Sequence, residues 1–183
     1  HSFYKSNPQE FYAFYKDRMI FPSAKPNKAH EYLAKLENEG KLKAIITQNI
    51  DSLHTIAGSK NVFELHGSVM RNYCEKCRKF YDLDYVMQSD GVPYCTCGGM
   101  VKPDVVLYEE QLDDNVLRGA IDAISNADML IIGGTSLIVY PAAGLIRYFS
   151  GKHLVLINKS QTTADGWADL VIHDAIGEVF NKL

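Results

Sequence analysis

The stretch from Ala44 to Asp51 reads Ala-Ile-Ile-Thr-Gln-Asn-Ile-Asp and joins an apolar run to a polar cluster. Its first three residues have the composition of a buried strand, so the polar residues Thr47 to Asp51 follow at the carboxyl end of that strand. In open α/β sheets, ligands bind outside the carboxyl ends of the strands. A turn rich in Asn and Asp would give the same string. The stretch alone therefore leaves a binding site and a plain turn equally open.

Apolar runs alternate with helical patterns on both sides of this stretch. The first clear strand spans residues 43–48, and further strands are expected at 62–65, 128–132, 153–157 and 170–172. In the run at 128–132, the four residues after Asp128 are all apolar, as in a strand that is buried on both faces. Residues 101–108 are expected to be extended and apolar. Helices are expected at about 8–20, 27–39, 115–125, 141–149 and 175–183. This alternation predicts an α/β fold with a Rossmann-like parallel sheet and helices on both faces.

Two helix starts are marked by local signals. Asn7 precedes Pro8 and has a glutamate three positions later, so Asn7 is expected to cap the first helix. The second helix begins near Asn27 and stops at Gly40. We expect His30, on that helix, to pack or cap locally and not to take part in chemistry.

Composition sets limits on the class of protein. The chain has 183 residues, 46% of them hydrophobic, enough to bury a substantial core with a small appendage. The net charge of −3 and the pI near 6.1 give no sign of a general nucleic-acid surface. No apolar run approaches the length that crosses a membrane.

The four cysteines form two closely spaced pairs, Cys74-x-x-Cys77 and Cys95-x-Cys97. Four thiolates presented by two tight turns predict one structural zinc ion, with no open coordination position for catalysis. The second pair is one residue shorter than usual. Free or disulfide-bonded cysteines are the alternative, and the cysteine usage favours a reducing compartment, with the cytoplasm as the expected location. We predict a zinc module at residues 73–100.

The remainder of the chain is predicted to form the other domain. Residues 1–72 and 101–183 are assigned to the Rossmann-like domain, although the helix near 8–20 is also compatible with the small lobe. Three of its strands end in small polar groups: Gln48 to Asp51, then Gly134-Thr135-Ser136, then Asn158. If the strands are parallel, these groups share one edge, where a dinucleotide would lie. Backbone amides and the Ser136 hydroxyl suit phosphate or ribose oxygens, and Asn158 suits a ribose diol.

Together these strings resemble the sirtuins, the NAD-dependent protein lysine deacylases, in a short bacterial-type form. The resemblance runs along essentially the whole chain. It rests on Pro26-Asn27-x-x-His30, Thr47-Gln48-Asn49-Ile50-Asp51, Leu65-His66-Gly67, the four cysteines, Lys102-Pro103-x-Val105-Val106, Gly134-Thr135-Ser136-Leu137 and Ile157-Asn158.

The resemblance implies a role for each residue of the nicotinamide side. His66 would be the general base that activates a hydroxyl of the nicotinamide ribose. Asn49 and Asp51 would orient the nicotinamide and its ribose, Gln48 would contact the ribose beside them, and Ile50 belongs to the same cofactor-binding string. The implied reaction removes an acyl group from a protein lysine and releases nicotinamide and O-acyl-ADP-ribose.

The resemblance also assigns the rest of the cofactor site and the substrate site. Ser136 and Asn158 match positions that bind the phosphate and the adenosine ribose, and Asp174-Ala175 resembles the loop that closes over adenine. The edge strand from Val105 through Val106 and Leu107 to Tyr108 resembles the segment that pairs with an acylated-lysine peptide. No nucleic acid or membrane partner is implied.

Two departures from the family pattern affect these expectations. The family begins upstream with a Gly-Ala-Gly-x-Ser loop that binds the diphosphate, and this sequence starts beyond it, so we expect an incomplete cofactor site. Glu109-Glu110 follows Tyr108 where the family more often has Gly-Glu, and a glutamate there should restrict the backbone. Two alternatives remain open: a non-catalytic, zinc-stabilised fragment that binds peptide or nucleotide, and a mono-ADP-ribosyltransferase.

Overall fold

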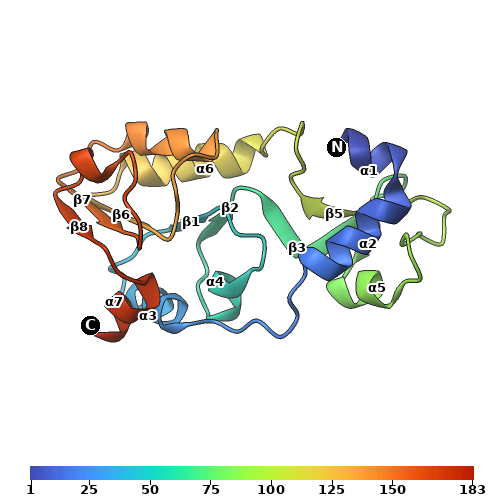
Figure 1. The fold of residues 1–183 in the computed structure, drawn as a ribbon, viewed down its shortest axis with the longest axis horizontal. Helices are drawn as coiled ribbons and strands as arrows, with labels where there is room; N and C mark the ends of the chain where they lie inside the picture. Colours follow the sequence, from blue (N-terminus) through green and yellow to red (C-terminus); the bar gives the residue numbers. More distant parts are fainter. The chain divides into compact units, whose positions relative to one another are not determined.

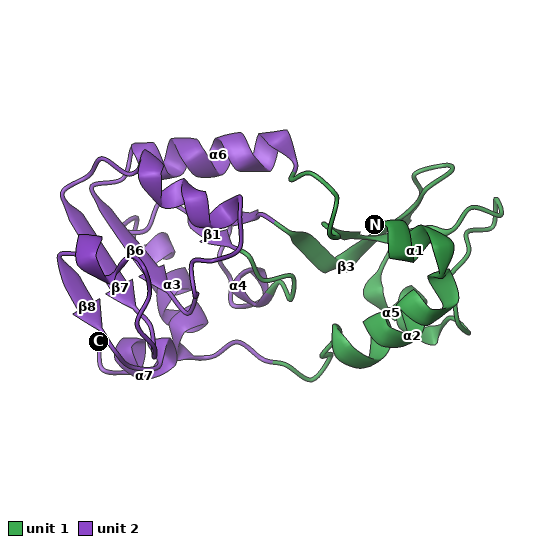
Figure 2. Cartoon of the chain, turned by 45° about the horizontal axis from the view of Figure 1, so that its top comes forward, with its two compact units in different colours: residues 1–24, 48–52, 66–112 green, residues 25–47, 53–65, 113–183 purple.

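A computed structural model describes all 183 residues. Its contacts divide the chain into two compact units, each built from several segments (Figure 2). Unit 1 comprises residues 1–24, 48–52 and 66–112, and unit 2 comprises residues 25–47, 53–65 and 113–183. The cysteine-containing unit is thus larger than the predicted module of residues 73–100. None of the helices combines the length and the apolar character needed to cross a membrane.

Unit 2 contains the parallel strands. β1 (Ile45–Thr47) pairs with β2 (Val62–Glu64), and β6 (Met129–Gly133), β7 (His153–Ile157) and β8 (Leu170–Ile172) form a second sheet in the order β6-β7-β8. Every pairing within these two sheets is parallel. The predicted parallel α/β architecture is confirmed, although the strands belong to two sheets and not to one.

Helices cover both faces of the β6-β7-β8 sheet (Figure 1). α6 (Asp114–Ser125) and the 3₁₀ helix η1 (Ala142–Tyr148) lie on one side, and α3 (Lys28–Asn38) and α7 (Ile176–Asn181) lie on the other. The α3–α7 side is sealed by a cluster around Ala29, Ile157 and Phe180. The short α4 (Leu53–Ile56) and the 3₁₀ helix η2 (Asp165–Trp167) complete unit 2.

The expectation that the strand at 128–132 is buried on both faces is wrong. Met129 is 51% exposed and Ile131 is 38% exposed, whereas the alternate residues Leu130 and Ile132 are half-buried. The alternation arises because successive strand side chains point to opposite faces, and β6 is the edge strand of its sheet. Apolar composition alone did not reveal that one face is open.

Unit 1 is an antiparallel sheet covered by aromatic helices. β3 (Gly67–Cys74) lies between β4 (Phe80–Tyr81) and β5 (Val101–Val105), and α1 (Ser2–Ser6), α2 (Pro8–Arg18) and α5 (Leu83–Gln88) pack beside them. Its core is unusually rich in tyrosine, with Tyr4, Tyr12 and Tyr15 at most 1% exposed. The Tyr12 hydroxyl donates to the Val101 carbonyl, which ties α2 to β5. α1, β3, β4 and α5 were not predicted from the sequence as separate elements.

The two predicted helix starts have different outcomes. The second predicted helix, α3, begins next to Asn27 as expected, and Asn27 caps it, because its side chain accepts from the backbone of Ala29 and His30. His30 completes the cap by accepting at Nδ1 from the Asn27 N–H, 3.1 Å away, so its predicted local role is confirmed. The expected Asn7 cap is wrong. Its side chain makes no capping bond to α2 and donates instead to the Ser6 hydroxyl, since α1 ends immediately before it.

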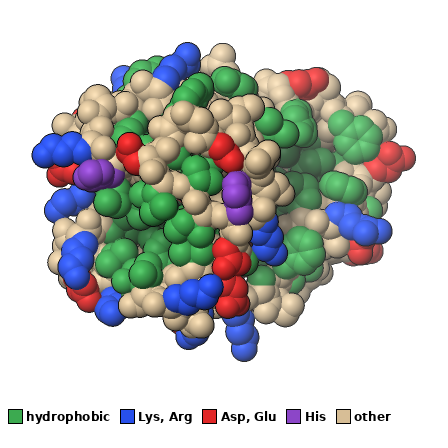
Figure 3. All heavy atoms as spheres, turned by 60° about the vertical axis from the view of Figure 1, so that its left-hand side comes forward, with side chains coloured by type: hydrophobic (Ala, Val, Ile, Leu, Met, Phe, Trp, Pro, Cys, Tyr) green, Lys and Arg blue, Asp and Glu red, His purple; other side chains and the backbone are tan.

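Charged side chains of both signs are mixed on the face drawn in Figure 3. Lys and Arg alternate there with Asp and Glu and form no continuous basic area, as the net charge of −3 leads one to expect.

Candidate active site and metal centre

His66 is held against the polar loop that follows β1. Its Nδ1 lies 3.0 Å from the backbone carbonyl oxygen of Gln48. A carbonyl oxygen only accepts, so Nδ1 must carry the hydrogen, and the lone pair of the neutral ring is then on Nε2. The half-buried His66 thus has a fixed tautomer and a ring nitrogen available to take a proton.

Two further contacts hold the same loop against the start of β3. The Val69 N–H donates to the Ile50 carbonyl at 2.9 Å, and the hydroxyls of Ser52 and Ser68 lie 2.6 Å apart. Ser68 is fully buried, which favours a single arrangement of this pair. The loop residues between these anchors include Asn49, which is exposed, and Asp51, which is half-buried. Neither serine was predicted to belong to the site, because an isolated serine beside a strand end carries no pattern.

Gly67 permits the close packing of β3 on β5 next to His66. It adopts φ = +71°, and a Cβ added there would lie 1.8 Å from the carbonyl oxygen of Asp104. Only glycine fits both the left-handed backbone and that approach. The glycine therefore allows the chain to turn from His66 into β3.

The predicted substrate segment begins beside His66 in the same unit. The Val106 N–H donates to the His66 carbonyl at 3.0 Å, and β5 pairs with β3 on one side only. The extended conformation expected to reach Tyr108 ends earlier, at Val105. Residues 107–110 form a turn closed by Glu110 N–H to Leu107 C=O at 3.0 Å, and Tyr108 at its tip is 93% exposed.

The other predicted cofactor residues lie in unit 2, at the ends of β6 and β7. Gly133 is in register with Ile157, so Gly134 and Asn158 follow neighbouring strands side by side. Gly134 has φ = +63° and donates its N–H to the Ile157 carbonyl. The Thr135 hydroxyl accepts from the Leu137 N–H at 3.2 Å. This left-handed turn leaves the exposed Ser136 at the strand end.

Asn158 follows β7, and the pair Asp174-Ala175 follows the neighbouring parallel strand β8. The Asn158 N–H donates to the Ile172 carbonyl of β8, and its side-chain amide donates to the Ser160 carbonyl. Asp174 accepts from the Ala175 N–H at 2.7 Å. That hydrogen bond and the Lys182 ammonium hold the pKa of Asp174 below its ordinary value, so the residue is an anion at neutral pH.

The four predicted metal ligands converge in unit 1. Their sulfur atoms all lie within 4.8 Å of one another. The Sγ atoms of Cys74 and Cys97 are 3.5 Å apart, and those of Cys77 and Cys95 are 3.6 Å apart. Four ligands about 2.3 Å from a tetrahedral zinc lie about 3.8 Å from one another. The thiols therefore fit one zinc ion, despite the shortened second pair.

Hydrogen bonds favour ionisation of two of these thiols, Cys74 and Cys95, whereas the neighbouring cysteine thiols raise the pKa of Cys97 to about 12. The Cys77 N–H lies 3.5 Å from the Cys74 sulfur and lowers the pKa of that thiol. The Cys97 N–H and then the Tyr81 hydroxyl lower the pKa of Cys95 to about 5. Metal coordination requires thiolates, so both effects favour binding.

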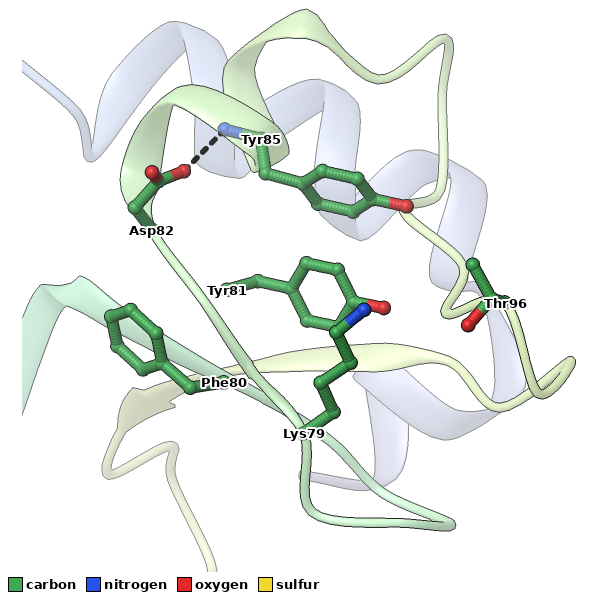
Figure 4. Close-up of a pocket in the computed structure, with 6 residues that line it drawn as sticks. All are labelled: Lys79, Phe80, Tyr81, Asp82, Tyr85 and Thr96. Carbon is green, nitrogen blue, oxygen red and sulfur yellow. Dashed lines mark hydrogen bonds between the residues drawn. The ribbon is translucent and has the colours of Figure 1, made fainter.

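A shallow pocket of about 420 Å³ lies next to the cysteine cluster (Figure 4). Tyr81 and Tyr85 lie with ring centroids 4.2 Å apart, and the Tyr81 hydroxyl points toward the segment that carries Thr96. None of the residues that line this pocket was predicted to be functional. They are Lys79, Phe80, Tyr81, Asp82, Tyr85 and Thr96.

Comparison with known proteins gives a consistent result. The sequence model of the Sir2 family matches residues 1–141. The chain is 70% identical over 185 aligned residues to an NAD-dependent protein deacetylase of Clostridium perfringens, covering 100% of this chain and 76% of the relative. It superimposes on a Sir2 protein with p53 peptide and NAD⁺ at a TM-score of 0.90 and 43% identity, covering 99% of this chain and 78% of the other.

A second solved structure contains the products of the reaction. It is a Sir2 protein with an inhibitor, 2′-O-acetyl-ADP-ribose and deacetylated p53 peptide, with a TM-score of 0.91 and 44% identity over 99% of this chain and 80% of the other. The family model covers well over half of the chain, and the relatives and structures agree with it. This chain belongs to the Sir2 family, and its relatives named here make it a sirtuin of the bacterial type.

Proposed function

We propose that this chain removes acyl groups from lysine side chains of proteins in a reaction that consumes NAD and water and releases nicotinamide, O-acyl-ADP-ribose and the free lysine. The observation that carries the proposal is the His66 ring, whose Nδ1 is bound to the Gln48 carbonyl and whose Nε2 is thereby basic. The same residue adjoins the start of the predicted peptide segment, through Val106. The proposed base is therefore bonded directly to the proposed peptide-binding segment, which suits the transfer of an acyl group from a lysine of the bound peptide.

His66 acts in this proposal as the general base. Bound NAD supplies the ribose carbon that receives the acyl oxygen, the nicotinamide leaving group and the hydroxyl that takes over the acyl group. His66 holds the proton of that hydroxyl at Nε2 while the hydroxyl becomes a nucleophile. The Gln48 carbonyl stabilises the imidazolium that forms, because its oxygen faces the Nδ1–H. Asn49 and Asp51 orient the nicotinamide and its ribose, and Gln48 and Ile50 shape the same loop.

The strand ends of unit 2 bind the remainder of the dinucleotide. Thr135 and Ser136 offer hydroxyls and backbone amides to phosphate oxygens, and the left-handed turn at Gly134 places them at the strand end. Asn158, at the end of the neighbouring strand, binds the adenosine ribose. The side-by-side register of Gly133 and Ile157 supports this division of roles. Asp174 and Ala175 close over the adenine.

The metal has a structural role. Cys74, Cys77, Cys95 and Cys97 would hold one zinc ion, and four thiolates leave no coordination position for a substrate. Bound zinc would join the turn after β3 to the segment before β5 through its coordination bonds to these thiolates. Free thiols of this kind require a reducing compartment, so we place the protein in the cytoplasm.

The direct test is nicotinamide release from NAD in the presence and absence of an acetyl-lysine peptide. We expect release that depends on the acylated peptide and is matched mole for mole by deacylated peptide and O-acetyl-ADP-ribose. Release without acylated peptide, together with transfer of label from NAD to protein, would favour mono-ADP-ribosyl transfer. No release under either condition would refute the proposed reaction.

His66→Ala tests the assignment of the base. Removing the imidazole should lower kcat for deacylation by about 10²–10⁴-fold, the usual contribution of a general base. The zinc-to-protein ratio and the circular dichroism spectrum should stay at wild-type values. The matched control is His153→Ala, which removes an exposed histidine at the start of β7. Equal activity of the His66→Ala and wild-type proteins would refute the role of His66.

A further inference from the structure

A half-buried ion pair stabilises the turn that follows β5. The Lys102 ammonium lies 3.0 Å from the Glu110 carboxylate, and the two side chains are only 19% and 21% exposed. Six other ion pairs of Lys or Arg have more exposed cations, from Arg71 at 39% upward. Lys102 and Glu110 are better shielded from water than these six pairs, so their charges are less screened than charges at the surface.

Each member of the pair also binds backbone of the predicted substrate segment. The Lys102 ammonium donates to the carbonyls of Pro103 at 3.3 Å and Val105 at 3.1 Å. The same Glu110 oxygen that faces Lys102 accepts from the Leu107 N–H at 2.9 Å. The last carbonyl of β5 and the first amide of the turn are thus linked through two side chains.

We propose that Lys102 and Glu110 are positioning residues that set the path of the segment from Val105 to Tyr108 for binding the acylated peptide, an inference that rests on the proposed function. They act through backbone groups and have no contact with the chemistry themselves. The Tyr108 side chain, 93% exposed at the tip of the turn, depends on this path for its place. The pair therefore acts on peptide affinity and not on nicotinamide cleavage.

The backbone of the turn explains why such a brace is needed. Glu109, the third residue of the turn, has φ = +78°, a left-handed conformation that costs a residue with a side chain about 1–2 kcal/mol relative to glycine. Turns of this kind ordinarily place glycine there. Two charge-assisted hydrogen bonds from the Lys102–Glu110 pair offset that cost, so the turn keeps one conformation without glycine.

The test compares steady-state constants of four full-length proteins: wild type, Lys102→Met, Glu110→Gln and the double variant. We expect each single change to raise KM for an acetyl-lysine peptide about tenfold, the scale on which the loss of one charge-assisted hydrogen bond acts. KM for NAD and kcat at saturating peptide should change less than twofold. The double variant should be no worse than either single variant, because both remove the same brace.

Controls separate positioning from general damage. Lys102→Arg keeps the charge and should restore most of the peptide affinity. Arg71→Met removes the exposed Arg71–Asp104 pair on the same two strands and should leave the peptide KM unchanged. Amide hydrogen exchange should show faster exchange at Leu107 and Glu110 in Lys102→Met and unchanged protection in β3. If Lys102→Met does not fold, the isosteric Glu110→Gln provides the same comparison.

Two failures have different meanings. A wild-type chain that releases no nicotinamide would overturn the proposed function. An active wild type, with wild-type peptide KM in Lys102→Met and Glu110→Gln, would overturn only the positioning role. A fall in kcat with unchanged peptide KM would also overturn it, because the pair would then act on the chemical step.

Discussion

At the scale of single residues, the geometry around His66 depends on backbone atoms that have no sequence signature. Its tautomer is set by the Gln48 carbonyl, and the close pairing of β3 with β5 beside it is possible only because residue 67 is glycine. A histidine followed by glycine is easily noticed in the sequence. The partner carbonyl and the 1.8 Å approach to Asp104 are not, because they join residues 18 and 37 positions apart.

Gly67→Ala should destabilise the protein by at least about 2 kcal/mol, because a left-handed backbone and a steric overlap act together. Gly40→Ala is the matched control. Gly40 has a nearly equal φ of +73°, but an added Cβ there has no atom within 4 Å. Only the conformational term, about 1 kcal/mol, should then remain. Urea unfolding of both variants measures the difference, and equal losses would show that the close approach does not matter.

At the scale of elements, helix ends show which local signals are strong enough to act alone. Asn27 caps α3 and Asp113 caps α6, where its carboxylate accepts from Asn115 N–H at 2.8 Å and Val116 N–H at 3.0 Å. Asn7 carries the same kind of signal but faces the end of α1, so its side chain turns to Ser6. A cap signal therefore succeeds only where the preceding chain leaves the helix start open.

Asp113→Ala should lower the free energy of unfolding by about 1 kcal/mol, since two helix amides lose their acceptor. The neighbouring change Asp114→Ala removes a first-turn carboxylate that makes no cap bond, and it should cost only a few tenths of a kcal/mol. Thermal unfolding of unit 2, followed by circular dichroism, compares the two variants. A larger loss for Asp114→Ala would contradict the assignment of the cap.

The turn after β5 is also linked to α1 by a carboxylate, and this contact depends on pH. The Ser2 hydroxyl and backbone N–H donate to Glu109 at 2.6 and 2.7 Å and lower its pKa to about 2. A folded pKa below the ordinary value of 4.5 means that the contribution to stability is fully present above pH 4.5. That contribution is then lost as the pH falls toward 2.

The pH prediction is tested by the difference in melting temperature between wild type and Glu109→Gln. We expect the wild type to be the more stable protein above pH 4.5 and the difference to shrink steadily toward pH 2. The carboxylate is exposed, so the effect should also weaken in high salt. A difference that grows on acidification would show that Glu109 is not an acceptor in the folded protein.

At the scale of the whole molecule, contacts divide the chain into two units whose residues interleave along the sequence. Unit 1 gathers the cysteines, His66 and the segment from Val105 to Tyr108, and unit 2 carries the parallel strands with Gly134 to Ser136 and Asn158. The aromatic core around Tyr4, Tyr12 and Tyr15 belongs with the cysteines, since α1 and α2 pack on β5. Residues distant in sequence therefore share one folding unit with the metal site.

Removal of zinc should act on unit 1 selectively. A strong chelator, or Cys95→Ser, should raise the rate of amide hydrogen exchange in residues 66–112. The reason is that the loops joining β3, β4 and β5 then lose the zinc ion that links them. Residues 113–183 should keep their protection. The change Thr96→Ser at the neighbouring exposed position is the control and should have no effect. Equal loss of protection in both units would indicate one cooperative structure.

Much of the fold follows from local pattern. The strands His153–Ile157 and Leu170–Ile172 are found where expected, and α3 and α6 begin within one residue of their predicted starts. These elements were predictable because their apolar periodicity and cap residues lie within one short window of sequence. The eight-residue β3 was not predicted, because its buried and exposed residues do not alternate regularly. The alternation is interrupted where the register of β3 against β5 shifts.

The sequence by itself determined the chemistry available to this protein: a histidine, His66, after the second strand, four thiols in two pairs, and polar residues after three apolar strands. These features are composition and spacing, which are present before folding. The tertiary structure alone decided the His66 tautomer, the exposure of one face of β6, the early end of β5 and the Lys102–Glu110 brace. Each of these depends on how the chain packs in three dimensions, and no pattern within one short stretch of sequence encodes it.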